Sequence, residues 1–411
     1  MQFLICLVPD RELWSIHNIR WLVIIRFLAN IIFYSTVIVR FESSRGLNFT
    51  QMFLLESIIS VAALVFDIPT GIWADQFGYR RVLLLGYGLC ALSVAIFAFT
   101  YGFWWFAFAS VLFGTGITSI SGCEDALIYE SIPPEKAISL GTSAFALLNA
   151  ASSAGFLFGL SVGSFMGTSN PALPVIVSIL PAILAWVMTL KLRPVARRMQ
   201  QEQDGPALAP SGARHFLFSA AKLMREQPAA VGLSLFSNAA FVLISAIFWY
   251  NQPYFARVGI PVALFGPITA AAVGLQLVVA LLTPQMKRRV GSSAALALSC
   301  IVPGIAYIAL PITRAPLLTA MLVALIATGH AWRQPIVNDE LNQRIPDGAR
   351  ATTLSALSFI GTLAGIVLNP LIGRAGDLGL DITGVSIGLS LILLGLVVPL
   401  LVSRRKAITP R

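Results

Sequence analysis

Four ionisable residues interrupt long apolar stretches of this 411-residue chain, and their chemistry defines the first candidate site. They are Arg26, Asp67 and the adjacent pair Glu124 and Asp125. A charge in an apolar environment is costly, so such residues are usually retained for ion pairing, proton transfer or ligand binding. We therefore treat these four positions as candidates for function.

The four residues are expected to share one depth. Each lies about six to eight residues from the basic end of its apolar run, which at 1.5 Å per residue is roughly 10 Å. Crowded, buried carboxylates hold a proton more readily than carboxylates in water, so this cluster predicts a proton-coupling site. The alternative is a fixed ion pair between Arg26 and Asp67, with Glu124 and Asp125 near water.

Glu56 stands apart from this cluster, in the other half of the same apolar run as Asp67. The sequence places no cation near it, and that isolation makes it a second candidate for proton binding. The alternative is a partly hydrated carboxylate at the outer vestibule.

A second group of polar and aromatic residues suggests a substrate cavity. His330 and Arg333 flank Trp332 within an apolar run, and a cationic, aromatic-lined cavity favours anionic or aromatic ligands. Alternatively, His330 is neutral and hydrogen-bonded. Further cavity candidates near the outer ends of their runs, where aromatic side chains also serve as interfacial anchors, are Tyr34, Trp249, Tyr250 and Asn251.

Composition identifies the elements that must position these residues. Apolar residues make up 57% of the chain and charged residues 11%, and the mean hydropathy is +0.82. Soluble domains carry about 25% charged residues, whereas a membrane helix needs roughly 20 apolar residues in a row. The chain is therefore expected to be an all-α, multi-pass membrane protein, and its net charge of +10 to mark cytoplasmic loops rather than nucleic-acid binding.

The apolar runs predict twelve membrane spans in two halves. We expect an N-terminal six-helix bundle over 1–192, a cytoplasmic linker over 193–227 with a surface helix near Phe216–Arg225, and a C-terminal six-helix bundle over 228–411. With both termini cytoplasmic, about 22 of the 28 Lys and Arg fall on the cytoplasmic side. The expected spans are about 19–40, 50–74, 81–99, 103–131, 137–166, 171–192, 228–250, 260–284, 291–311, 315–343, 348–372 and 383–402.

The turn between the second and third spans carries a recognisable motif. It consists of Gly71, Asp75, Gly78, Arg80 and Arg81, in which Gly71 allows close helix approach and Gly78 a tight turn. Asp75 is expected to accept N–H bonds from a facing helix end. The spacing resembles the loop signature of the major facilitator superfamily of transporters, although Gln76 and Tyr79 stand where that family usually has basic residues.

Two further features strengthen this resemblance. Segments near 132–137 and 345–351, and near 71–81 and 283–291, correspond at one shift of about 213 residues, as expected for parallel halves. A stripe of Gly155, Gly159 and Gly163 predicts tight helix packing and is similar to a glycine motif of antiporters in the superfamily, with Phe156 in place of Pro. Asp339, Glu340 and Arg344 are expected to form a salt-bridged helix end.

The resemblance implies alternating access between two bundles, without specifying a substrate. We expect proton-coupled efflux of a small organic solute. The alternatives are proton-coupled uptake of a small metabolite, anionic metabolites included, and a non-transporting sensor or assembly partner. An enzyme is not expected, because no nucleophile–base pair, phosphate loop or metal motif is present. The expected setting is the bacterial cytoplasmic membrane, with a monomer that contacts lipid, protons and solute but no nucleic acid, metal or cofactor.

Overall fold

The computed structural model describes residues 11–195, 227–344 and 350–403, and the regular elements in these ranges are all helical. Ten segments in these ranges are long and apolar enough to cross a membrane. One of them, Val262–Ala309, contains α13 (Phe265–Ala309), in which Gly291 has φ 80° and ψ 161° and divides the helix into two spans. With α14 (Pro316–Asn342), these segments account for the twelve predicted spans. The all-α membrane fold is confirmed.

Residues 196–226 of the predicted linker, including the expected surface helix, lie outside the described residues. Residues 345–349, which form most of the repeat segment 345–351, also lie outside the described residues.

The chain divides into two compact units. The first comprises Met1–Val37 and Ile58–Pro210, and the second Ile38–Ser57 and Ser211–Arg411. A short segment that joins the first two spans thus groups with the C-terminal helices.

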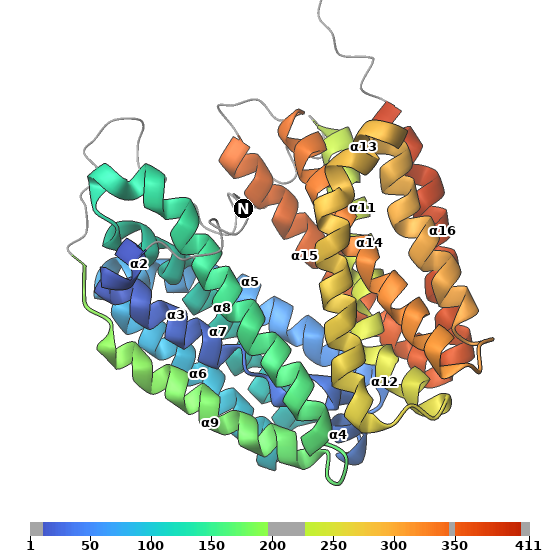
Figure 1. Cartoon of the computed structure of the whole chain (residues 1–411), viewed down its shortest axis with the longest axis horizontal. Coiled ribbons are helices and arrows are strands. Elements are labelled where there is room, and N and C mark those ends of the chain that lie inside the picture. The colour runs from blue at the N-terminus through green and yellow to red at the C-terminus, as the bar shows by residue number, and fades with distance from the viewer. Residues whose placement is uncertain (1–10, 196–226, 345–349, 404–411) are drawn as a thin grey trace, which may run out of the picture. The chain divides into compact units, whose positions relative to one another are not determined.

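The first unit is built from the six N-terminal spans. Within it α6 packs against α7 and α9, and α3 packs against α8 and α9. Its helices are α2 (Arg11–Ser15), α3 (His17–Ala29), η1 (Phe33–Thr36), the later part of α5 (Phe49–Phe77), α6 (Tyr79–Phe99), α7 (Phe103–Ser131), η2 (Pro134–Lys136), α8 (Ala137–Met166), α9 (Ala172–Met188) and η3 (Thr189–Lys191) (Figure 1).

The first span is interrupted where α3 ends at Ala29. Its backbone resumes helical geometry only in η1, and the N–H of Phe33 donates to the Ser178 hydroxyl at 3.1 Å. The glycine stripe of α8 receives both the end of α3 and this irregular segment: a Cβ at Gly155 would lie 2.2 Å from the Phe27 carbonyl oxygen, and one at Gly163 1.8 Å from that of Phe33. The tight packing predicted for the stripe is confirmed.

The second unit contains the six C-terminal spans. In it α13 packs against α14 and α16, and α11 packs against α14 and α15 (Figure 1). Its helices are α4 (Ile38–Ser44), the start of α5, α11 (Pro228–Ser245), α12 (Ile247–Arg257), η4 (Val262–Leu264), α13, α14, α15 (Arg350–Leu378) and α16 (Leu380–Ser403).

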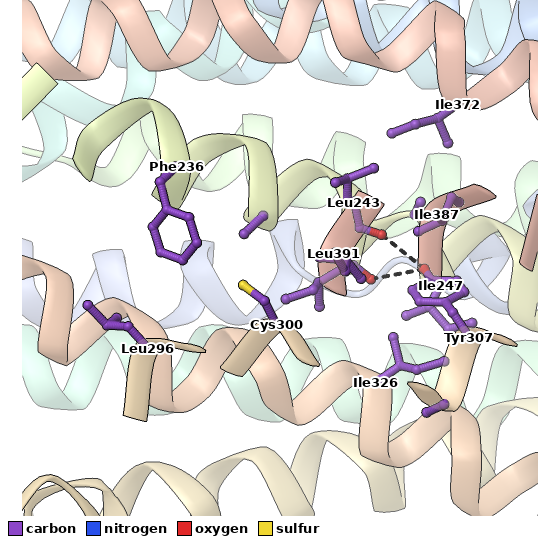
Figure 2. Close-up of a cluster of buried hydrophobic side chains, with 14 of the residues drawn as sticks. Phe236, Leu243, Ile247, Leu296, Cys300, Tyr307, Ile326, Ile372, Ile387 and Leu391 are labelled. Atoms are coloured by element: carbon purple, nitrogen blue, oxygen red, sulfur yellow. Dashed lines mark hydrogen bonds between the residues drawn. The ribbon is translucent and has the colours of Figure 1, made fainter. Parts of the chain in front are cut away.

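Apolar side chains from these helices form one buried cluster. Figure 2 shows Phe236 of α11 above Leu296 and Cys300 of α13, with Tyr307 at the other end of the cluster. The Tyr307 hydroxyl donates to the carbonyl oxygens of Leu243 at 3.0 Å and Ile244 at 3.4 Å. This polar group is therefore buried without losing its hydrogen bonds, as an apolar interior requires.

The start of α5 is held on α15 by a single carboxylate. Asp377 accepts the N–H groups of Phe49 at 2.8 Å and Thr50 at 3.2 Å, and the Thr50 hydroxyl at 2.5 Å. Within the turn itself, the Asn48 side chain accepts the N–H of Gln51 at 2.9 Å. The Asn48 N–H in turn donates to the Gln51 side chain at 3.1 Å, so all four N–H groups that a helix start leaves unpaired have acceptors, two of them from another helix.

Candidate functional site

A buried ion pair lies in the first unit, between α3 and α7. Arg26 Nε is 2.7 Å from Glu124 Oε2, and the Glu124 side chain is 0% exposed. Asp125 lies on the rim of this pair, 4.0 Å from an Arg26 terminal nitrogen and 61% exposed. The structure therefore brings three of the four predicted residues together, with the two neighbouring carboxylates in different environments.

Tyr87 of α6 completes this cluster and was not predicted. Its side chain is buried and interacts with Glu124. The sequence does show a tyrosine within the apolar run of α6, which could have marked Tyr87 as a candidate. Sequence periodicity, however, does not reveal which neighbour its ring faces.

Asp67 stands outside the ion pair. It is exposed and accepts a hydrogen bond from the Thr118 hydroxyl of α7 at 3.2 Å. The ion pair between Arg26 and Asp67, expected as the alternative arrangement, is not formed among the described residues, because Glu124 takes the guanidinium instead. Thr118 lies about two helical turns, or roughly 10 Å, before Asp125 on the same helix.

Glu56 has an acidic neighbour that the sequence analysis did not nominate. Glu42 of α4 is 4% exposed, while Glu56 of α5 is partly buried. Burial, and secondarily the nearby Glu56 carboxylate, raise the pKa of Glu42 well above its ordinary value. Glu42 could have been nominated from the sequence, because it is an acidic residue just beyond the end of the first apolar run.

A cavity of about 510 Å³ lies in the second unit, between α11, α14 and α15. His330, Gln334 and Asn338 line it from α14, at a spacing of four residues that places them on one helix face. That spacing could have identified Gln334 and Asn338 from the sequence. The other lining residues are Ser234, Ser237, Asn238, Phe241, Val337, Leu341, Leu354, Leu357, Ser358 and Thr362.

Arg333 lies behind this cavity rather than in its wall. Its side chain is 0% exposed, and one terminal nitrogen contacts His330 Nδ1 at 3.1 Å. Its Nε and its other terminal nitrogen have no hydrogen-bond partner among the described residues, and neither has the buried Nε1 of Trp332. The cavity wall is consequently less cationic than the sequence predicted, and His330 is hydrogen-bonded, as in the alternative.

The remaining substrate candidates occupy packed positions. Tyr250 is 0% exposed and donates to the Ile372 carbonyl at 2.7 Å, and Asn251 is also buried. Neither residue has the exposure of an interfacial anchor, and Trp249 packs edge-on against Phe53. Tyr34 lies in the first unit beside a mainly apolar cavity of about 60 Å³.

The loop motif forms a separate polar site. Gly78 has φ 82°, as the predicted turn requires, and Arg80 donates to the Leu190 carbonyl at 2.9 Å. Asp75, Arg80 and Arg81 line a cavity of about 280 Å³. The close helix approach predicted at Gly71 is not formed within this unit, since a Cβ there would meet no atom within 4 Å.

The C-terminal end of α14 carries salt bridges at the three predicted residues. Asp339 pairs with Lys287 of α13, and Arg344 pairs with Glu340 at 3.3 Å. In the described part of the chain, no group of three or more His, Cys, Asp and Glu side chains could hold a metal ion.

Comparison with known proteins places this architecture among membrane transporters. Residues 20–369 match the family described as the Major Facilitator Superfamily. A class D tetracycline resistance protein from Salmonella ordonez is 28% identical over 235 residues, a match that covers 54% of this chain and only 57% of that protein. The uncharacterized MFS-type transporter YxaM from Bacillus subtilis (strain 168) is 23% identical over 354 residues, 83% of this chain and 84% of YxaM.

Solved structures share the fold at low sequence identity. The nucleoside transporter NupG aligns with a TM-score of 0.78 and 15% identity over 93% of this chain and 98% of NupG. A bacterial homolog of the human lysosomal transporter Spinster aligns with a TM-score of 0.68 and 17% identity, covering 96% of both chains.

Proposed function

The chain belongs to the Major Facilitator Superfamily, and from this premise we propose that this secondary transporter exports a small organic solute in exchange for protons across the bacterial cytoplasmic membrane. The observation that carries the proposal is the buried pair of Arg26 and Glu124, with nitrogen and oxygen 2.7 Å apart and no exposure of the carboxylate. The similarity to a protein named for tetracycline resistance supports export, since resistance is served by removing a compound.

The pair suits proton coupling because its two charges are stable only together. A buried carboxylate that loses its cation must either return to water or bind a proton. A conformational step that separates α3 from α7 would therefore load a proton onto Glu124, and re-forming the pair would release it. Asp125 and Asp67, both exposed, supply carboxylates through which the proton reaches water.

The test uses everted membrane vesicles that hold an acid-inside gradient, followed with a pH-sensitive dye. Tetracycline, sugars and organic anions are added singly, with vesicles lacking the protein as the blank. We expect a protein-dependent collapse of the gradient by at least one compound. That collapse should be abolished in Glu124→Gln and reduced in Asp67→Asn, because neither amide binds a proton.

Glu135→Gln is the matched control, because it makes the same change on an exposed residue of η2. The control should respond like the wild type. A normal response from Glu124→Gln would remove this residue from coupling. A gradient-driven accumulation of solute in intact cells would instead identify uptake, and the absence of any solute movement would favour a sensor.

A further inference from the structure

The contact between Arg333 and His330 fixes the protonation state of the histidine ring. A guanidinium has N–H donors and no acceptor, so the 3.1 Å contact must run from the Arg333 N–H to His330 Nδ1. Nδ1 is therefore unprotonated, and a neutral His330 carries its proton on Nε2. An imidazolium would place two N–H groups against each other beside a buried cation.

The position of the ring places this proton at the cavity. His330 lines the 510 Å³ cavity, and its ring packs against Phe241 with centroids 4.8 Å apart. Held between Phe241 and Arg333, the ring has one nitrogen committed to Arg333, and the described residues make no hydrogen bond with Nε2. The Nε2–H is thus an oriented donor with no acceptor from the protein.

The other polar groups of the cavity wall are hydroxyls and carboxamides. Its described lining residues include Asn238, Gln334 and Asn338, and none of those residues is a carboxylate, a lysine or an arginine. Such groups can satisfy the acceptors and donors of an uncharged ligand. They cannot neutralise a full charge, whose loss of water would remain uncompensated.

We propose that Arg333 is a positioning residue that holds His330 as an Nε2–H donor, and that the cavity selects an uncharged solute with carbonyl or hydroxyl acceptors. This inference rests on the proposed transport function, because the cavity is taken as the substrate site. An organic anion drawn by the charge of Arg333 is the competing ligand, and the experiment separates the two.

The first measurement is the 15N spectrum of the full chain, labelled at its histidine rings and held in lipid nanodiscs. The chain has three histidines, so the His330 signals are assigned by their loss in His330→Gln. We expect an unprotonated Nδ1 and a protonated Nε2. A ring protonated at Nδ1, or at both nitrogens, in the wild type would overturn the proposal whatever the variants do.

Arg333→Met removes the donor, and we expect the two neutral tautomers to become mixed. Arg333→Lys restores a donor and should restore the Nε2–H form. His17→Gln is the histidine control, since His17 lies in the first unit and contacts the Lys191 carbonyl at 2.8 Å. A wild-type spectrum unchanged by Arg333→Met would remove the positioning role.

The ligand class is tested with three probes that share one ring and differ in charge: uridine, uridine 5′-monophosphate and 5′-amino-5′-deoxyuridine. At millimolar concentration we expect uridine alone to shift the His330 Nε2 signal, and His330→Leu to weaken its binding about two- to tenfold, as for one lost hydrogen bond. Shifts from a charged probe alone, or from none of the three, would overturn the class. The nanodisc measurement uses no proton gradient. Its result therefore stands even if the vesicle experiment shows that transport is not coupled to protons.

Discussion

Two buried ionic groups illustrate, at the scale of single residues, how differently charge is accommodated in this chain. Glu124 is paired with Arg26, so the cost of removing it from water is largely offset. Arg333 is equally buried, but its only hydrogen-bond partner among the described residues is the imidazole of His330. An ion pair is suited to opening and closing with proton transfer, whereas a lone cation is suited to orienting the group it touches.

Glu42 predicts a pH-dependent stability. Because its pKa is raised in the folded protein, the folded state holds the proton more tightly than the unfolded state. Stability is therefore greatest at low pH and falls as the pH rises from the ordinary glutamate value through the folded pKa, by up to about 1.4 kcal/mol per pH unit. Glu42→Gln should remove this loss and be more thermostable than the wild type at high pH.

The measurement is thermal unfolding in detergent between pH 5 and pH 8. Glu12→Gln serves as the control, because Glu12 is exposed and its pairing with Lys136 lies in the first unit. If the thermal midpoints of Glu42→Gln and the wild type changed with pH in parallel, ionisation of Glu42 would not destabilise the folded protein.

Sequence reasoning found part of this chemistry and could not have found all of it. Equal distances from the basic ends of the runs placed Arg26 and Glu124 at one depth, and the structure pairs them. Depth does not determine rotation about the helix axis, so the choice of Glu124 over Asp67 as partner was left open. Tyr87 was missed for the same reason, because its role depends on which neighbour its ring faces.

Helix ends and helix surfaces are the features that matter at the scale of elements. The first turn of α5 uses Asn48 for its local cap and Asp377 of α15 for two further N–H groups. Gly373 allows this contact, since a Cβ there would lie 2.6 Å from the Phe49 carbonyl oxygen. A loop that looks self-contained in the sequence is thereby attached to a helix more than 300 residues away.

The glycine stripe of α8 gives a prediction with an internal control. Gly163→Ala places a Cβ 1.8 Å from the Phe33 carbonyl oxygen, a backbone atom that cannot move aside without disturbing the irregular first span. We expect a destabilisation at or above the usual 1–3 kcal/mol for overpacking, seen as a lower thermal midpoint and less folded protein by size exclusion.

Gly141→Ala makes the same change on the same helix where no atom lies within 4 Å of the new Cβ. It should be neutral or slightly stabilising, since alanine favours a helix over glycine by up to about 1 kcal/mol. If the two variants changed stability equally, contact with the first span would not be what the stripe provides.

The elements themselves were largely predictable because membrane spans are long and apolar. The exception is the break after Ala29, where Ile31, Ile32 and Phe33 read as a continuation of the helix. Their backbone departs from helical geometry because α8 offers a glycine surface and Ser178 an acceptor. Both supports are tertiary contacts, and the local signal in the sequence was Asn30, which caps α3 and donates from its side chain to the Arg26 carbonyl at 2.8 Å.

At the scale of the whole molecule, the chain divides into two compact units, and one N-terminal segment belongs to the second of them. The break between six and six spans follows from hydropathy and from the internal repeat. Ile38–Ser57 nevertheless groups with the C-terminal helices, through contacts such as that of Ser57 with the Ile366 carbonyl at 2.9 Å. Covalent order therefore does not decide which unit a segment packs with.

The distribution of basic residues predicts the orientation of the whole chain. Arg80, Arg81 and Lys136 stand at one set of turns, and the sequence places most Lys and Arg on that side, which the positive-inside rule makes cytoplasmic. Single cysteines in a cysteine-free chain, probed in intact cells with a thiol reagent that cannot cross the membrane, test this. We choose four exposed residues, one for each predicted side of the membrane in each half of the chain: Ser43, Glu135, Arg289 and Arg314.

We expect Ser43→Cys and Arg314→Cys to react in intact cells, and Glu135→Cys and Arg289→Cys to react only after the membrane is opened. The reversed pattern would show that the chain has the opposite orientation in the membrane, and the proposed direction of proton flow would then be reversed as well. If Ser43→Cys reacted from outside while Arg314→Cys did not, an odd number of spans would separate them. The parallel repeat, which requires an even number, would then be wrong even though every helix were correctly placed.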